Sequence, residues 1–570
     1  MDRGAGRLRI GAGHAMTELQ RRLARWSAER PDRLAFAFMP DGTTVTDALT
    51  FGALDRDARG VARSLGEVGA GGRPVLLLCE PGPAFVTALV GCLYAGALAT
   101  PVPVSRRRAG VARLAAVARD ADPAAILATV DRSAVPDERL AAAPWLRVDE
   151  AARNAPAAVS AVAEDHPAVI QYTSGSTTSP KGVVLSHGNL AANLRMLRDG
   201  FGAHESSRYL SWLPLFHDMG LIAHVLAALY NGGPCWFAPP LSFFRRPETW
   251  LRAIALHGAT ISGAPNFAYE SCVRRFPTMQ LDGLSLASWE VAFCGAEAVR
   301  ASTMERFSAL FAPYGFRAAA LRPCYGLAEA TVFVTAARGV RTLPATQSPT
   351  AAPLVSCGTP SPDATLVVVD PETLRPRQDG EIGEICVSGS HVAKAYWRRP
   401  AESDATFGAE IEGPDGPVTA LRTGDLGLLR DGELYVTGRL KDVILVRGET
   451  IHAEDVEQAV GASHPELDGL CAAFGLEVDG EEQVVVVQEA PRGGFRAAPE
   501  TLIDAAARAV ADTFGVRLYD LARVRTGAIP RTTSGKVQRG RCRALYASGE
   551  LPLQGGGVGH LSLGRNQRPR

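Results

Sequence analysis

Short β-type runs alternate with Ala-, Leu- and Arg-rich helical stretches through the first two thirds of the chain. Runs such as 73–79 (RPVLLLC) and 124–130 (AAILATV) fit buried strands, whereas 17–30 (TELQRRLARWSAER) has an N-cap residue and helical spacing of its apolar residues. Alternation at this pitch predicts parallel α/β layers with helices on both faces. Because 570 residues are too many for one hydrophobic core, we expect at least two domains.

The character of the sequence changes at about residue 359. Short β-type runs separated by Asp-Gly and Pro-Asp turns predict a β-rich subdomain, and they are 365–370, 383–389, 418–429 and 432–439. Beyond residue 440 we expect a helix at 453–461, strands at 470–476 and 482–489, and a helix at 499–514. The predicted fold class is therefore α/β: a large N-terminal domain (1–440) of parallel α/β layers plus the β-rich subdomain, then a small mobile α+β C-terminal domain (441–550). The Gly-rich residues 551–570 are expected to form a flexible tail.

Charge and cysteine content argue against several classes of protein. Lys+Arg and Asp+Glu each number 60, so no net field favours nucleic acid or an anionic membrane. The 10 cysteines include no C-x-x-C pair, which argues against a zinc site and against a disulfide framework. A reducing cytoplasm is the simpler interpretation.

Residues 81–105 carry no charge and are long enough to span a bilayer. Glycines and prolines interrupt this stretch and its last third has β character, so we expect a buried helix running into a strand, with no stable membrane insertion. The first fifteen residues lack the apolar run of a signal peptide. They are expected either to be disordered or to precede a true start at Met16.

The stretch 172–183 (YTSGSTTSPKGV) is rich in small hydroxyl residues and contains two glycines and Lys181. Backbone N–H groups of such residues form a concavity that suits phosphate oxygens. The P-loop pattern of nucleotide triphosphatases is not met, because Pro180 precedes the lysine and Gly182 follows it. A flexible linker would not sit directly between the apolar strand 167–172 and the segment 183–190 (VVLSHGNL), which opens a helix. We therefore predict a phosphate-binding loop.

Six segments, in this order, resemble the signatures of the adenylate-forming superfamily, which includes acyl-CoA ligases, peptide-synthetase adenylation domains and luciferases. They are 172–183, 295–299 (GAEAV), 324–331 (CYGLAEAT), 422–427 (RTGDLG), 438–444 (GRLKDVI) and 530–539 (PRTTSGKVQR). Taken singly, an aspartate in a turn, a glutamate at a helix start or a buried histidine has a plainer structural explanation. The ordered co-occurrence of all six carries the resemblance.

The resemblance implies that a carboxylate attacks the α-phosphate of ATP and forms an acyl-adenylate and pyrophosphate, with ATP and Mg²⁺ as cofactors. It implies that the β- and γ-phosphates are held by Thr173, Ser174, Gly175, Ser176, Thr177 and Lys181. Glu329, together with Thr173, would ligate Mg²⁺, and Thr331 would touch the α-phosphate.

The same resemblance assigns the rest of the nucleotide site. Tyr325 would stack on adenine beside Gly326, with a pocket wall formed by Gly295, Ala296 and Glu297. Asp425 would accept the two ribose hydroxyls, and Arg439 would help to hold the sugar. Lys536 would bridge the substrate carboxylate and the α-phosphate, which makes it a catalytic residue with His217, Glu329 and Thr173. Lys441 stands at the hinge position between the domains.

Longer runs narrow the resemblance to the fatty acyl-AMP ligases, which pass a fatty acyl group to the phosphopantetheine thiol of an acyl carrier protein. They are 213–222 (LPLFHDMGLI), 243–270, 288–299 (SWEVAFCGAEAV) and 355–360 (VSCGTP). The acyl pocket implied by this resemblance comprises His217, Met219, Ile222, Ala264, Asn266, Phe267 and Gly326. A buried core strand would carry similar residues, so composition alone does not distinguish an acyl pocket from a core strand.

Two departures from that group bear on the acyl acceptor. The segment 332–354, where these ligases usually carry an insertion, is short, and VRGETIHAEDVE (446–457) reads closer to the general superfamily pattern. An acyl carrier protein is the first choice of acceptor, and coenzyme A, as in an acyl-CoA ligase, is the alternative. A non-catalytic nucleotide- or acyl-binding homologue is the third hypothesis. The presence of Lys181, Glu329, Asp425 and Lys536 argues against it.

Overall fold

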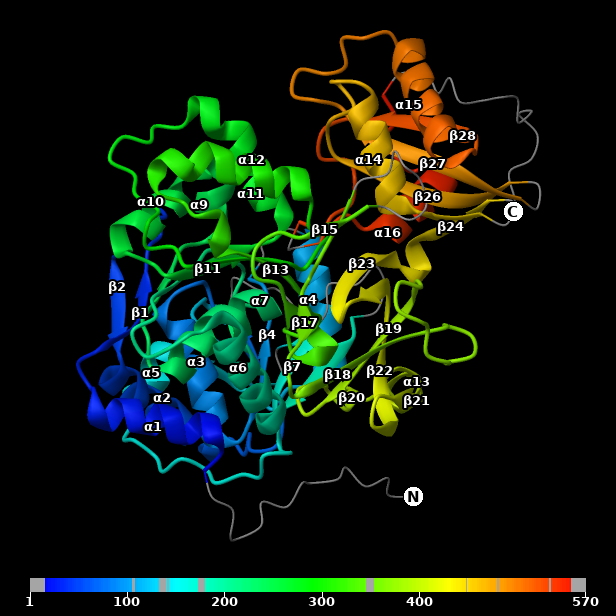
Figure 1. Cartoon of the computed structure of the whole chain (residues 1–570). Coiled ribbons are helices and arrows are strands. Elements are labelled where there is room, and N and C mark those ends of the chain that lie inside the picture. Colours follow the sequence, from blue (N-terminus) through cyan, green and yellow to red (C-terminus); the bar gives the residue numbers. More distant parts are fainter. Residues whose placement is uncertain are drawn as a thin grey trace.

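The computed structural model describes residues 16–104, 108–132, 140, 143–172, 180–344, 353–446, 449–478, 481–532 and 535–554. A large α/β body carries a β-rich unit on one side, and the end of the chain, from orange to red, forms a small α+β unit above them (Figure 1). This arrangement confirms the predicted fold class. The expectations for residues 1–15 and 555–570 concern parts of the chain outside the described ranges.

The first layer is a seven-stranded sheet in the order β20-β8-β7-β4-β3-β5-β6. Its parallel strands are β3 (Pro74–Leu78), β4 (Leu98–Pro101), β5 (Ala125–Ala128), β6 (Trp145–Arg147) and β7 (Pro167–Tyr172). Side chains alternate across a strand, so Val75 and Leu77 face the large core with α2 (Phe51–Glu67) and α3 (Pro83–Ala95). Leu76 and Leu78 pack on the other face against α4 (Arg108–Ala121). Both faces are covered by helices, as buried parallel strands require.

The uncharged stretch 81–105 folds as α3 followed by β4, as its composition predicted. Gly91 lets α3 approach α2, because a Cβ there would lie 2.5 Å from the Cγ1 atom of Val61. Within the described ranges, every helix is too short or too polar to cross a membrane.

A second, nine-stranded sheet has the order β17-β14-β13-β12-β11-β9-β10-β1-β2. Its outer strands are β17 (Thr359–Pro360), β14 (Thr335–Ala336), β9 (Tyr209–Ser211), β10 (Cys235–Phe237), β1 (Leu34–Phe38) and β2 (Asp47–Thr50). Its neighbours β11 (Ile261–Ala264), β12 (Val291–Cys294) and β13 (Leu321–Tyr325) run parallel, so their carboxyl ends open at one edge. Asn266, Gly295 and Gly326 follow directly after these ends. Open α/β sheets bind ligands in such a position.

The segment after the phosphate-loop stretch differs from its prediction. A short strand, β8 (Gly182–Ser186), pairs antiparallel with β7 before the helix α6 (His187–Phe201) begins. The helix starts at His187 because the side chains of Ser186 and Asn189 form a capping box.

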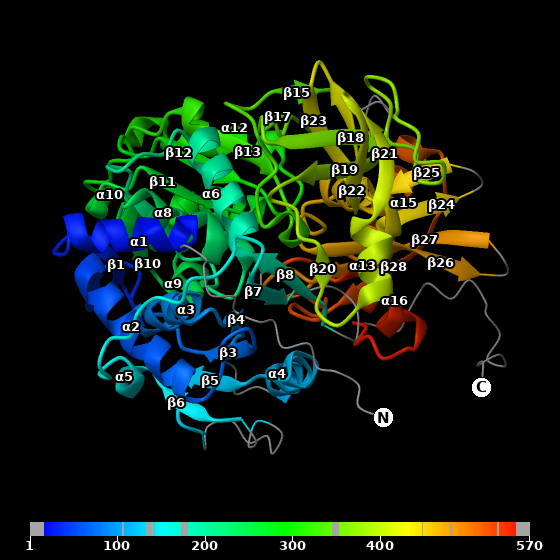
Figure 2. The ribbon, with the colours of Figure 1, turned by 90° about the horizontal axis from the view of Figure 1, so that it is seen from below.

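The β-rich unit is an antiparallel sheet whose strands include the four runs predicted from sequence, together with β21, which was not predicted. Its strands are β18 (Ala364–Val369), β19 (Gly383–Gly389), β21 (Ala409–Gly413), β22 (Gly416–Arg430) and β23 (Glu433–Arg439). One strand, β20 (Ala395–Tyr396), leaves this unit and pairs with β8 of the first sheet (Figure 2).

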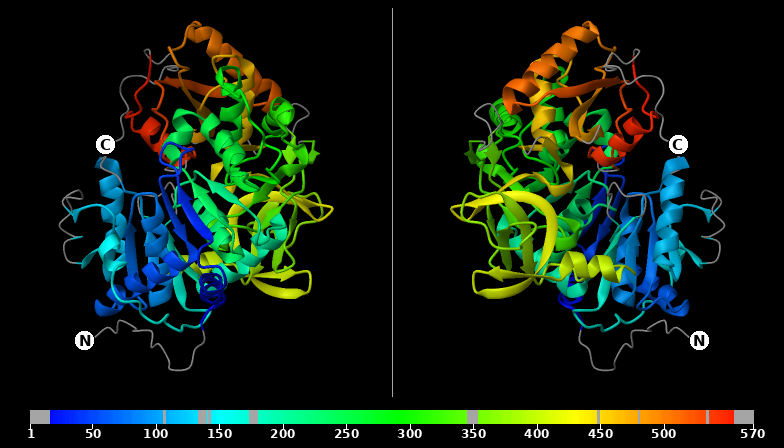
Figure 3. Two further views of the ribbon diagram at one scale, coloured as in Figure 1. Left: turned by 90° about the vertical axis from the view of Figure 1, so that its left-hand side faces the viewer. Right: turned by 90° about the vertical axis from the view of Figure 1, so that its right-hand side faces the viewer.

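The small unit has a three-stranded sheet of β26 (Cys471–Val478), β27 (Glu481–Glu489) and β28 (Leu518–Val524). Val484 and Val486 face α14 (Ala453–Ser463) and α15 (Pro499–Phe514), which lies outermost in Figure 3. Val485 and Val487 face the opposite side, where α16 (Arg539–Ala547) packs. Leu551 is buried in this second cluster, so the tail predicted to begin at 551 starts later, because the chain after α16 still covers the sheet.

Arg539 connects three segments of the small unit. Its guanidinium contacts Glu457 through Nε and Oε1 at 2.7 Å, Asp442 through Nη1 and Oδ2 at 3.2 Å, and Glu454 at 3.3 Å. Only 14% of the Arg539 side chain is exposed. The contacts join α16 and α14 to the 3₁₀ turn Leu440–Asp442, where the small unit begins.

We predict that Arg539→Ala lowers the free energy of unfolding of the small unit by about 3 kcal/mol, because it leaves a buried carboxylate unpaired. Urea unfolding monitored by hydrogen exchange in β26–β28 measures this change. The matched control is Arg541→Ala on the exposed side of the same helix, which should change stability by no more than about 0.5 kcal/mol. Equal stability of the two variants would contradict the prediction.

Candidate active site

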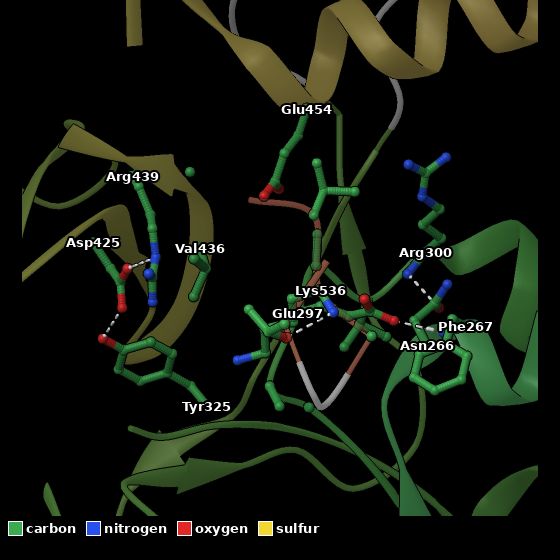
Figure 4. Close-up of a pocket in the computed structure, with 18 of the residues that line it drawn as sticks. Asn266, Phe267, Glu297, Arg300, Tyr325, Asp425, Val436, Arg439, Glu454 and Lys536 are labelled. Atoms are coloured by element: carbon green, nitrogen blue, oxygen red, sulfur yellow. Dashed lines mark hydrogen bonds and ion pairs between the residues drawn. The ribbon is translucent and has the colours of Figure 1, made fainter. Parts of the chain in front are cut away.

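A cavity of about 1420 Å³ lies at the carboxyl ends of β11, β12 and β13, between the large body and the small unit. It brings together most of the residues that the sequence predicted. These are Lys181, His217, Met219, Asn266, Phe267, Gly295, Ala296, Glu297, Tyr325, Gly326, Glu329, Asp425, Arg439, Lys441 and Lys536. Figure 4 shows that both units contribute, with Glu297 and Tyr325 on the large body and Lys536 on the small unit.

Asp425, Arg439 and Tyr325 form one corner of the cavity (Figure 4). Asp425 on β22 pairs directly opposite Arg439 on β23, and Arg439 Nε lies 2.8 Å from Asp425 Oδ1. The Tyr325 hydroxyl donates to Asp425 Oδ2 at 2.8 Å. Burial raises the pKa of Tyr325 well above its ordinary value, and the Asp425 carboxylate adds to the shift, so the phenol keeps its proton. The corner presents a fixed carboxylate beside a flat ring, which suits a ribose and a base.

Two glycines make room at the adjoining wall. A Cβ on Gly326 would lie 1.8 Å from the Val332 carbonyl oxygen, and a Cβ on Gly295 would lie 2.7 Å from Cys324 Sγ. Any side chain at these positions would therefore push the strand ends apart. The next residue after Gly295 is Ala296, which has a φ of 68°, a value that costs a non-glycine residue about 1–3 kcal/mol.

Lys536 enters the cavity from a turn of the small unit. Its backbone N–H donates to Thr532 Oγ1 at 3.0 Å, and the Thr532 N–H donates to the Lys536 carbonyl at 2.8 Å. Burial lowers the pKa of Lys536, Arg439 lowers it further, and the carboxylates of Asp218 and Glu297 oppose the shift. The ammonium group is therefore surrounded by charges from the large body.

Glu297 connects the cavity wall to the start of a neighbouring helix. Its Oε1 accepts a hydrogen bond of 2.6 Å from the Phe267 N–H, at the start of α11 (Asn266–Arg275). Asn266 Oδ1 accepts from the Arg300 N–H at 3.0 Å. Burial raises the pKa of Glu297, and Lys536 opposes that shift.

His217 lines the cavity together with a group of apolar side chains, here called the apolar branch. Its Nδ1 lies 2.6 Å from Oδ1 of Asp218, and the Met219 N–H donates to that carboxylate at 2.6 Å. Burial raises the pKa of Asp218, but His217 outweighs it and the net pKa is lowered. The branch suits an alkyl chain, and its walls are Leu197, Phe201, Ala223, Phe293, Val332 and Phe333.

Three predicted residues do not line the cavity. Ile222 lies in the π-helical turn Leu221–Leu226 and points into the large core, so Ala223 lines the cavity instead. Ala264, at the end of β11, is fully buried. Thr331 is also buried, because its hydroxyl donates to the His391 carbonyl at 2.6 Å.

Thr331 is nonetheless unusual, with φ 68° and ψ −62°. The Val332 N–H donates to the Ala330 carbonyl at 2.8 Å, which closes a strained γ-turn around it. The predicted phosphate contacts Thr173, Ser174, Gly175, Ser176 and Thr177 lie outside the described residues.

Glu329 and Lys181, which the sequence predicts to bind Mg²⁺ and phosphates, both line the cavity. Oε1 of Glu329 accepts a hydrogen bond of 2.9 Å from Tyr396, and burial raises the pKa of this carboxyl group. Lys181 Nζ lies 2.5 Å from Glu402 Oε2. The described part of the chain contains no group of three or more His, Cys, Asp or Glu residues that could hold a metal ion. A single carboxylate beside a phosphate site fits Mg²⁺, which takes most of its ligands from phosphates and water.

Sequence reasoning missed several residues of this site. Asp218 stands next to His217, so its adjacency to a predicted residue was an available signal. Tyr396 and Glu402 lie in AYWRRPAESD, which has no local pattern that points to a site. Strand pairing between β20 and β8 brings them there.

Comparison with known proteins identifies the family. Residues 23–397 match the AMP-binding enzyme family. The chain is 37% identical over 557 residues to the medium-chain-fatty-acid–[acyl-carrier-protein] ligase JamA of Moorena producens, covering 91% of this chain and 93% of that protein. It is 35% identical over 565 residues to the long-chain-fatty-acid–AMP ligase FadD26 of Mycobacterium marinum, covering 91% and 95%.

A solved structure extends the likeness to three dimensions. The fatty acyl-adenylate ligase of L. pneumophila, in complex with acyl adenylate and pyrophosphate, matches with a TM-score of 0.71 at 33% identity. The match covers 95% of this chain and 97% of that one. The chain therefore belongs to the AMP-binding enzymes of the adenylate-forming superfamily, and it is similar to the fatty acyl-AMP ligases over nearly its whole length.

Proposed function

We propose that the protein activates a fatty acid with ATP, forms an acyl-adenylate and pyrophosphate, and passes the acyl group to the phosphopantetheine thiol of an acyl carrier protein. The observation that carries this proposal is one cavity that joins Lys536, the Asp425–Arg439–Tyr325 corner and an apolar branch. The names of the relatives, a fatty-acid–[acyl-carrier-protein] ligase and a fatty-acid–AMP ligase, support the acid and the acceptor.

The chemical step brings one anion against another. A carboxylate oxygen of the acid bonds to the α-phosphorus, while the bond to the bridging oxygen breaks and its electron pair leaves with pyrophosphate. Cations placed before the reaction lower this barrier because they need not reorganise. We assign that role to Lys536, which carries its charge to the point where the apolar branch meets the nucleotide corner.

The other residues orient the reactants. Asp425 accepts the ribose hydroxyls, Arg439 balances the charge of Asp425, and Tyr325 stacks on the adenine. We assign His217 to the boundary between the nucleotide corner and the apolar branch, because it lines the same cavity as both. Such positioning converts a bimolecular encounter into an oriented reaction within one complex.

Glu329 would hold Mg²⁺, because it is a carboxylate that lines the cavity at the phosphate end beside Lys181. The bound cation would neutralise charge on the phosphate oxygens. Thr173 is the second predicted ligand and remains a prediction.

In the second half-reaction the carrier thiol attacks the acyl carbon of the adenylate, and the bond from that carbon to the phosphate oxygen breaks, so that AMP leaves and the thiol proton is released. We propose that the small unit rotates about Lys441 after adenylation, which withdraws Lys536. In the described arrangement, Arg274 of the large body lies 2.9 Å from Oδ1 of Asp468 in the small unit.

The ten cysteines are all free thiols, which supports a cytoplasmic location.

The proposed function predicts pyrophosphate release when the protein is mixed with ATP, Mg²⁺ and a medium- or long-chain fatty acid. A phosphopantetheinylated carrier protein should then be acylated, and free coenzyme A should not. Mass spectrometry of the carrier and of coenzyme A distinguishes the two acceptors. Thioester on coenzyme A would favour the acyl-CoA ligase, whereas no pyrophosphate with any acid would contradict the activity itself.

We predict that Lys536→Ala slows adenylate formation by about 10²–10³-fold while ATP binding changes little, because the lysine acts on the reacting atoms. Acid-dependent exchange of pyrophosphate into ATP measures the reaction, and calorimetry measures ATP binding. Lys394→Ala, at an exposed lysine, is the control. Unchanged exchange in the Lys536 variant would count against its assignment.

A further inference from the structure

Tyr396 stands between the two groups assigned to the phosphate end of the cavity. Its hydroxyl donates to Glu329 Oε1 at 2.9 Å, and Lys181 Nζ lies 5.2 Å from the centre of its ring. Tyr396 lines the cavity although only 6% of its surface is exposed. One side chain therefore contacts both the carboxylate and the cation.

The backbone around Tyr396 is held on both sides. Tyr396 pairs with Val183 in the β20–β8 ladder, and the Trp397 N–H donates to the Gly182 carbonyl at 2.7 Å, directly after Lys181. The Ala393 N–H donates to the carbonyl of Glu329 at 2.8 Å. The segment is thus attached to the backbone of Glu329 and to that of Gly182, the residue that follows Lys181.

The ring and the hydroxyl of Tyr396 have separate tasks. The hydroxyl donates to Oε1 of Glu329 at 2.9 Å, whereas the ring faces Lys181. Phe407 of α13 (Pro400–Phe407) packs against the ring, with centroids 5.1 Å apart. The ring face attracts the Lys181 ammonium without neutralising it.

Glu402 is the charged partner of Lys181 in this structure, at 2.5 Å. Arg399 also contacts Glu402, at 2.8 Å, so this carboxylate has a second cation when Lys181 turns to a phosphate. The aromatic contact with Tyr396 does not compete with phosphate oxygens, because a ring carries no net charge. Tyr396 is therefore suited to keep Lys181 in place in both states.

We propose that Tyr396 is a positioning residue that couples the metal-binding carboxylate to the phosphate-binding lysine. Its hydroxyl fixes the carboxylate of Glu329 for a divalent cation, and its ring holds Lys181 toward the phosphates. The inference rests on the proposed function, because it requires that Mg²⁺ and ATP bind in this cavity. Hydrogen-bonding partners of metal ligands typically contribute about 10–100-fold to metal affinity.

The test measures ATP binding by titration calorimetry, with Mg²⁺ and with a chelator, and needs no acid and no turnover. Tyr396→Phe keeps the ring and removes the hydroxyl. The factor by which Mg²⁺ increases the affinity for ATP should fall about tenfold. The affinity for ATP without metal should stay within about twofold of that of the wild type. Tyr396→Leu removes the ring as well, and should also weaken metal-free binding by about three- to tenfold.

Tyr94→Phe is the matched control. The Tyr94 hydroxyl donates to Asp55 at 2.8 Å and Arg59 lies 5.5 Å from its ring, so the same two contacts occur in the large core away from the cavity. Its ATP binding should equal that of the wild type. Thermal unfolding of each variant verifies the fold, and if Tyr396→Leu does not fold, Tyr396→Phe alone decides.

The outcomes separate this inference from the proposed function. If the wild type binds ATP and Tyr396→Phe responds to Mg²⁺ as Tyr94→Phe does, the coupling is overturned and the proposed function stands. If ATP binding by the wild type does not depend on Mg²⁺, the coupling is overturned as well. A wild type that binds no ATP overturns both.

Discussion

Repulsion between like charges is the constraint around which the cavity is organised. A carboxylate and a triphosphate, both negatively charged, must come together in the cavity. Cationic side chains therefore have to be held there with their positive charge still available to the substrates. Arg439 is paired with Asp425, and Lys181 with Glu402, whereas Lys536 is held among several carboxylates at longer range. Removing charges from water is costly, and these partners offset that cost until a substrate replaces them.

The division of the chain into two units follows from the same constraint. If Lys536 belonged to the large body, it would stay over the adenylate and obstruct a second reactant. Under the rotation proposed above, its place on the small unit would let it arrive and leave with that unit. Arg539 joins α16 and α14 to the turn Leu440–Asp442, so the turn that carries Lys536 is connected to the start of the unit.

Two of the six non-glycine residues with positive φ in the described part of the chain lie just beyond strands of the second sheet. Ala296 and Thr331 both have a φ of 68°, and Gly326 approaches the Val332 carbonyl too closely for any side chain. Such conformations persist only where the surrounding packing outweighs their cost. Here the packed strands β12 and β13 supply that support, and the wall of the cavity is held in a shape that a relaxed loop would not keep.

Sequence alone determined the α/β class, the β-rich runs after residue 359 and, through short local motifs, that Asp425 and Lys536 line one cavity. These features can be predicted because the hydrophobic periodicity, the turn residues and the spacing of motifs are local properties of a chain. Sequence also proposed Ile222, Ala264 and Thr331 for the cavity, and only packing decided that these side chains point elsewhere. Tyr396 and Glu402 show the converse: they reach Glu329 and Lys181 through the pairing of β20 with β8. Contacts between segments more than 200 residues apart depend on the whole fold, so the tertiary structure decided them.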